Sequence, residues 1–138
     1  MDLVAARTLV SSALARMTAA YGQTVFDEWS LLGLGGKGGV LAYTGPRPDS
    51  FRRDLPDDAA PLRAEAATQP SSVGDLVFAI ETSGTLYDVF LRIGETTYLV
   101  LNHTTKSMAE IRANPGWLKA QAVLFELGER FRTDPFVE

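Results

Sequence analysis

The chain has 138 residues, of which 46% are hydrophobic and 22% are charged, and its formal net charge is −4. This composition fits one globular domain spanning residues 1–138, and the negative charge disfavours nucleic acid as a partner. The absence of cysteine excludes disulfides, thiolate metal ligands and cysteine nucleophiles. Charges recur along the chain, so we expect no membrane span, no signal peptide and a cytoplasmic location.

Apolar residues at helical spacing predict a first helix from Leu3 to Tyr21, with Asp2 as its N-cap and Gly22 as its terminator. The apolar stretches "VFDEWSLLGL" and "VLAYT" that follow are typical of a β-hairpin. A proline-rich segment comes next, and it contains two short helical patterns, at 51–55 and 59–67.

Three further strands are expected at 75–81, 86–94 and 96–103. The second alternates, with one apolar face opposite Asp88 and Arg92. The third is apolar on both faces around Val100, so we expect it in the middle of a sheet, with Leu99, Val100 and Leu101 all buried. Helical signals close the chain: an S-x-x-E capping box at 107–110, the Asn114-Pro115 pair as a second helix start, and an apolar stripe from 117 to 131.

The stretch "GLGGKGGV" at 33–40 satisfies the dinucleotide-binding pattern G-x-G-x-x-G. That chemistry requires the glycines to open a helix, whose first amides hold the pyrophosphate. Here they precede a strand pattern, and Lys37 is followed by glycine where a P-loop has serine or threonine. We therefore expect a hairpin turn with Lys37 at its tip and no nucleotide cofactor.

The other polar residues that could carry chemistry are few. His103, the single histidine, follows Asn102 at the end of the predicted central strand, and we interpret it as part of a polar strand end. Asp27 and Glu28 are adjacent, so a regular strand would point them to opposite faces. No combination of nucleophile, base and metal ligands stands out. We expect no catalytic residue, no metal site and no cofactor.

The order of these elements resembles the profilin-like layout, and most of all roadblock-type domains. The resemblance implies an α+β fold, α-ββ-α-βββ-α, whose five-stranded antiparallel sheet has helices on its faces and residues 96–103 at its centre. It also implies a non-catalytic protein-interaction or scaffold module that regulates a small GTPase or an assembly complex. Pro56 and Pro61 divide the segment that is one continuous helix in roadblock domains.

Two functions follow from this resemblance. The first is a homodimer that presents a surface to a protein partner, with Leu76, Phe78 and Ile80 of an edge strand as its interface. The alternative is a small-molecule sensor domain similar to GAF and PAS domains. Its ligand pocket would lie between the sheet and the middle segment, beside His103 and Trp29. Enzymatic activity is not expected in either case.

Overall fold

The computed structural model describes residues 1–34, 39–46, 71–83 and 86–138. In chain order the elements are α1 (Leu3–Tyr21), β1 (Glu28–Gly33), β2 (Gly39–Thr44), β3 (Leu76–Ser83), β4 (Leu86–Arg92), β5 (Thr97–His103), α4 (Met108–Ala113) and α5 (Trp117–Thr133). The predicted α+β class is confirmed. The helical pieces expected at 51–55 and 59–67 lie outside the described residues.

All five strands belong to one antiparallel sheet in the order β2-β1-β5-β4-β3. The strand β5 lies between β1 and β4, and all of its residues are buried. Leu99, for example, pairs with Leu31 on one side and with Leu91 on the other. The prediction that 96–103 forms a central strand is therefore confirmed. Its apolar pattern agrees with this position, because a strand that is covered on both faces can bury apolar side chains on both.

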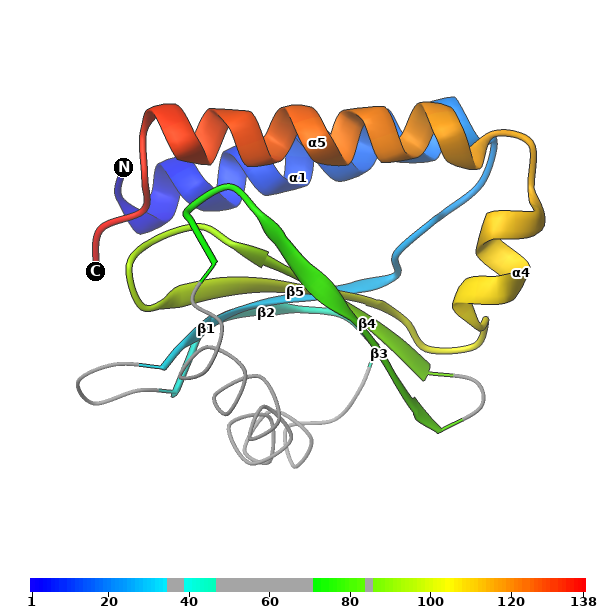
Figure 1. Cartoon of the computed structure of the whole chain (residues 1–138), viewed down its shortest axis with the longest axis horizontal. Helices are drawn as coiled ribbons and strands as arrows, with labels where there is room; N and C mark the ends of the chain where they lie inside the picture. The colour runs from blue at the N-terminus through cyan, green and yellow to red at the C-terminus, as the bar shows by residue number, and fades with distance from the viewer. Residues whose placement is uncertain (35–38, 47–70, 84–85) are drawn as a thin grey trace.

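The helices α1 and α5 lie side by side over one face of the sheet, and α4 lies at one end of it (Figure 1). We call this helix-covered side the first face. Each long helix turns one apolar stripe toward the sheet, as its periodicity predicts. The buried stripes are Ala6, Val10, Ala13, Met17 and Tyr21 in α1, and Trp117, Ala120, Val123, Leu124, Leu127 and Phe131 in α5.

The opposite, second face of the sheet is also buried at its centre. It carries a smaller cluster formed by Leu32, Phe90, Tyr98 and Val100. The alternation in β4 indicated a polar side opposite its apolar face, but Phe90 on that side is only 4% exposed. The strand β4 therefore buries apolar side chains on both faces: Val89 and Leu91 on the first face and Phe90 on the second.

The helix ends follow the local signals with one exception. Asp2 accepts a hydrogen bond from the Ala5 N–H at 2.8 Å, and Gly22 ends α1 with a φ of 94°. Ser107 caps α4 through the Glu110 N–H. The second helix start is wrong by two residues, because α5 begins at Trp117 and not at Pro115. The Asn114 side chain accepts the Gly116 N–H at 2.8 Å and so stabilises a turn before the helix.

The glycine stretch connects β1 to β2, with Gly33 and Gly39 as paired positions of the two strands. A strand, and not a helix, follows it, so the predicted hairpin is confirmed. Gly39 has a φ of 104°, which favours glycine over any residue with a side chain. Lys37, the expected tip of the turn, lies outside the described residues. Within the part of the chain that the structure describes, no helix is long and apolar enough to cross a membrane.

Candidate interaction surface

The strand β3 is the last strand of the sheet on one side: one of its edges pairs with β4, and the other, which we call the outward edge, pairs with no strand among the described residues. Two register shifts interrupt its pairing, one between Leu76 and Phe78 and one between Glu81 and Ser83. Between these irregularities, residues 78–81 pair regularly with β4. The outward edge therefore has a regular central part with a bulge on each side.

The first bulge changes the arrangement of the three residues predicted for the interface. Leu76 pairs with Leu91 and packs against the core of the first face. Phe78 and Ile80 lie in the regular part of the strand, where they pair with Phe90 and Asp88 of β4. A register shift of one residue therefore separates Leu76 from the other two residues along β3.

A short lead-in segment, residues 71–75, brings the chain to β3 and passes close to α5. Gly74 has a φ of 96°, and a Cβ atom built on Gly128 would overlap the carbonyl oxygen of Gly74. Glycine at both positions allows the two backbones to approach to a distance that side chains would prevent. This approach determines where β3 begins relative to α5.

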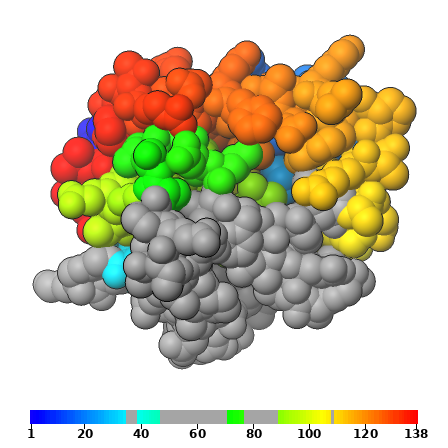
Figure 2. All heavy atoms as spheres, in the orientation of Figure 1, coloured from blue at the N-terminus to red at the C-terminus, as the bar shows by residue number. Residues whose placement is uncertain are grey.

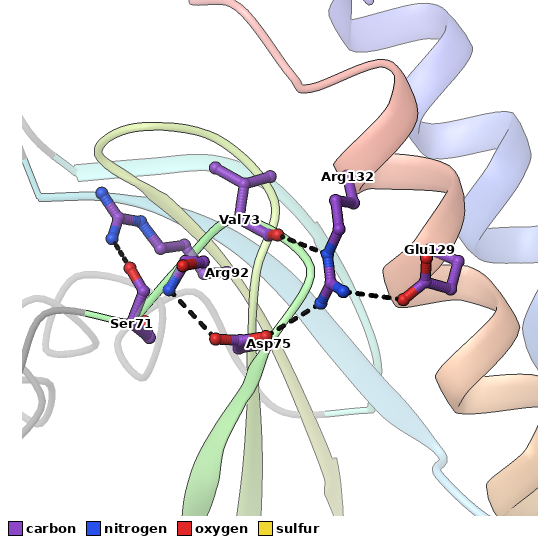
Figure 3. A network of polar contacts seen from close by, with 7 residues as sticks. Ser71, Val73, Asp75, Arg92, Glu129 and Arg132 are labelled. Atoms are coloured by element: carbon purple, nitrogen blue, oxygen red, sulfur yellow. Dashed lines mark hydrogen bonds and ion pairs between the residues drawn. The ribbon is translucent and has the colours of Figure 1, made fainter.

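An arginine of α5 strengthens the same junction (Figure 3). The Arg132 Nε donates to the Val73 carbonyl at 3.2 Å, while Nη2 lies 2.8 Å from the Asp75 carboxylate. Its Nη1 lies 2.8 Å from Glu129, one turn earlier on α5. A single planar guanidinium therefore connects the helix to the lead-in segment.

A second arginine, Arg92 at the end of β4, holds the lead-in segment from the other side. Its side chain donates to the Ser71 carbonyl, to Gly94 O at 3.2 Å and to Glu95 O at 2.6 Å. Its backbone N–H donates to the Asp75 carbonyl at 3.1 Å. Figure 3 shows Arg92 and Arg132 on opposite sides of Asp75. The two arginines thus fix the start of the edge strand.

A groove of about 920 Å³ opens along α5 next to this junction. Its lining comes from α1, from α5 and from the Gly74–Leu76 stretch, and it includes Leu9, Arg16, Leu76, Val123, Phe125, Glu126, Arg130 and Arg132. Several of its charged groups are already paired with each other: Arg16 with Glu126 at 2.7 Å, and Arg132 with Asp75 and Glu129. Such a surface suits apolar side chains of a partner better than a small ion.

The two residues assigned to a ligand pocket, His103 and Trp29, do not line this groove. Trp29 is buried in the core of the first face and pairs with Leu101. The Nδ1 atom of His103 accepts the N–H groups of Thr105 and Lys106 at 3.1 and 3.0 Å. The middle segment that would form the other wall of the predicted pocket lies outside the described residues, so the assignment of these two residues stays a prediction.

The adjacent acids Asp27 and Glu28 bind different partners, as their adjacent positions predict. Asp27 accepts the N–H and the hydroxyl of Thr104 at 2.9 and 2.6 Å. Glu28 is only 3% exposed and accepts the Tyr43 hydroxyl at 2.6 Å. The burial of Glu28 was not predicted, because the sequence does not show that β2 brings Tyr43 across to it.

In the described residues, no group of three or more His, Asp or Glu side chains is placed to hold a metal ion. No protein-family model matches the chain, and no curated protein matches it either.

Proposed function

We propose that the protein is a non-catalytic interaction module that works as a homodimer joined through the outward edge of β3. The position of β3 at the end of the sheet order is the observation that carries this proposal. In a symmetric dimer, the β3 strands of two copies would pair antiparallel and continue one sheet into the other.

The composition of β3 supports this use of its edge. Edge strands are usually protected by proline, by charges, by very short length or by bulges. The sequence LVFAIETS of β3 has eight residues, no proline and one charged residue, Glu81. The bulges lie toward its two ends, and residues 78–81 between them keep the regular geometry that a second strand needs.

The roadblock-type assignment within the profilin-like layout belongs to the same proposal. The sheet order β2-β1-β5-β4-β3, with α1 before β1 and with α4 and α5 after β5, supports it. We infer a cytoplasmic module whose partner is a protein, of the small-GTPase or scaffold-complex kind that the resemblance implies.

The sensor alternative has weaker support. The groove has the volume for a small molecule, but it lies along α5 and not beside His103 and Trp29. Its acidic groups already pair with arginines of the same chain. A small ligand that bound to these carboxylates would therefore have to share them with the arginines.

Sedimentation of two lysine variants tests the proposal. Phe78→Lys and Ala79→Lys each place a positive charge in the regular part of β3, at the positions that pair with Phe90 and Val89 of β4. Lysine on an edge strand opposes edge-to-edge pairing, because the charge would have to leave water when a second strand is added. Each variant should halve the sedimenting mass at tens of micromolar protein.

The matched control is Thr44→Lys, an exposed position on the opposite edge strand β2. This variant should keep the mass of the unaltered protein. Circular dichroism of every variant checks that the fold is kept. A mass that is the same for all three variants and the unaltered protein would show that the β3 edge is not used.

A further inference from the structure

The outer face of α5, directed away from the sheet, carries an apolar stripe in the place where a surface helix usually has charged residues. Leu118 is 74% exposed and Phe125 is 54% exposed, with the exposed Ala122 between them. Their spacing of four and three residues puts them on one side of the helix. We call these three residues the outer seam. Figure 2 shows that the surface of α5 is accessible along its length on the side viewed.

Opposite charges flank the outer seam along one side. Lys119 and Glu126 are both exposed and lie seven residues apart, which is about two turns of the helix. Both therefore project from the same flank, one near each end of the seam. Glu126 also lies 2.7 Å from Arg16 of α1, and this contact holds its carboxylate on that flank.

We propose that the outer seam binds the outer seam of a second copy, with the two α5 helices antiparallel and a twofold axis near Ala122. Each Leu118 then packs on Phe125 of the other copy. The two alanines meet at the centre, where their small side chains allow the helices to approach closely. The apolar area hidden from water drives this association.

The charges of the flank favour this arrangement over a parallel one. A twofold axis perpendicular to the helices brings the same flank of both copies together. Lys119 of each copy then lies beside Glu126 of the other, because the axis exchanges the two ends of the seam. A parallel pair has its twofold axis along the helices, so this flank would face the other flank of the partner and the Lys119–Glu126 pairs would not form. The two ion pairs between copies therefore favour the antiparallel orientation.

This contact goes beyond the proposed function, since it uses α5 and not the edge of β3. Two different self-complementary surfaces on one chain link dimers into larger assemblies. The unaltered protein is then larger than a dimer at tens of micromolar. Blocking the β3 edge leaves dimers joined by the outer seam, and blocking the outer seam leaves dimers joined by the β3 edge.

Sedimentation of seam variants tests the contact. Leu118→Glu, Phe125→Glu and the double variant should each reduce the sedimenting mass to that of a dimer, and adding Phe78→Lys should give a monomer. The control is Val4→Glu on α1, which is as exposed as Leu118 at 74% but lies outside the seam. If the seam is covered by a different protein, or by nothing, the seam variants will sediment like the control, and the contact is overturned.

The sedimenting masses of the same variants also show which of the two contacts, the seam or the β3 edge, is absent. If only the β3 contact exists, the unaltered protein is a dimer, Phe78→Lys is a monomer and the seam variants remain dimers. If only the seam contact exists, Phe78→Lys remains a dimer and the seam variants are monomers.

A charge exchange tests the orientation. Lys119→Glu alone and Glu126→Lys alone should weaken the seam contact by about tenfold each, since each replaces two attractions by two repulsions. The double variant should recover most of the lost affinity, because the pairs form again with reversed signs. Absence of recovery would overturn the antiparallel register.

A single introduced cysteine gives a second readout, because the natural chain has none. Ala122→Cys would place two thiols near the twofold axis, within the short range that a disulfide requires. Under mild oxidation it should form a covalent dimer, while Val4→Cys should remain a monomer on a denaturing gel. Equal cross-linking of the two variants would contradict the proposed axis.

Discussion

His103 shows how one polar side chain stabilises the backbone where a central strand ends. Its Nδ1 atom accepts the N–H groups of Thr105 and Lys106, the two residues that lead toward α4. An accepting Nδ1 requires the ring proton of the neutral form to be on Nε2. His103 itself is buried, with 7% of its surface exposed. The role of the ring in this structure is to provide one acceptor atom, Nδ1, for the backbone that follows the strand.

Two substitutions of His103 should therefore differ in stability. Leucine removes the acceptor of two part-buried hydrogen bonds, each of which contributes about 1 kcal/mol. Asparagine places its Oδ1 near the position of Nδ1 and should recover most of that loss. Urea unfolding of His103→Leu and His103→Asn measures both free energies. Equal destabilisation by the two changes would show that the volume of the ring matters more than the acceptor.

At the scale of an element, β5 is buried on both faces and contributes side chains to the apolar cluster of each. Leu99 and Leu101 pack under α1 and α5 in the core of the first face, while Val100 between them packs with Phe90 and Leu32 on the second. The strand therefore contributes to two separate apolar clusters. A strand with one solvated face would contribute to only one of them.

Truncation of Val100 separates these two cases. Val100 is 5% exposed, so Val100→Ala removes buried methyl groups and should lower the free energy of unfolding by about 2 kcal/mol. Leu99→Ala and Leu101→Ala should cost about 2–4 kcal/mol because more atoms are lost. Urea denaturation of the three variants provides the comparison. A neutral effect at Val100 would show that the second face is open to water in solution.

At the scale of the whole molecule, the last residues of the chain close the helix layer against the sheet. The Phe136 N–H donates to the Ile93 carbonyl at 2.8 Å, and Val137 donates to Met1 at 3.0 Å. Phe136 also forms a parallel bridge with Gly94, and its side chain belongs to the core of the first face. The segment 134–138 thus joins the first helix to the β4–β5 turn.

Phe136→Ala should be among the more damaging changes in the molecule. Phenylalanine truncation in a core costs about 3–5 kcal/mol, and here it also loosens a segment that connects both ends of the chain. Val137→Ala is the neighbouring control, because Val137 is 70% exposed and its removal should cost little. Thermal unfolding of both variants gives the comparison. A similar melting temperature for the two would show that the segment adds little to the stability of the fold.

The sequence by itself predicted features that depend on neighbouring residues. Asp2 and Gly22 bound α1, Ser107 caps α4, and the glycines at 33 and 39 lie in a hairpin. The central place of β5 also followed from its apolar pattern. Caps, turns and burial periods act within a few residues, so their signals can be read along the chain.

Only the tertiary structure decided the features that join distant residues. The approach of Gly74 to Gly128, the contact of Arg132 with Val73, and the burial of Glu28 beside Tyr43 each depend on two elements meeting in space. The bulge in β3 could not be predicted either, because it depends on how the strand pairs with β4 while its start is held against α5. No local pattern in the sequence encodes these contacts, because the packing of the whole sheet and its helices determines which residues lie next to each other.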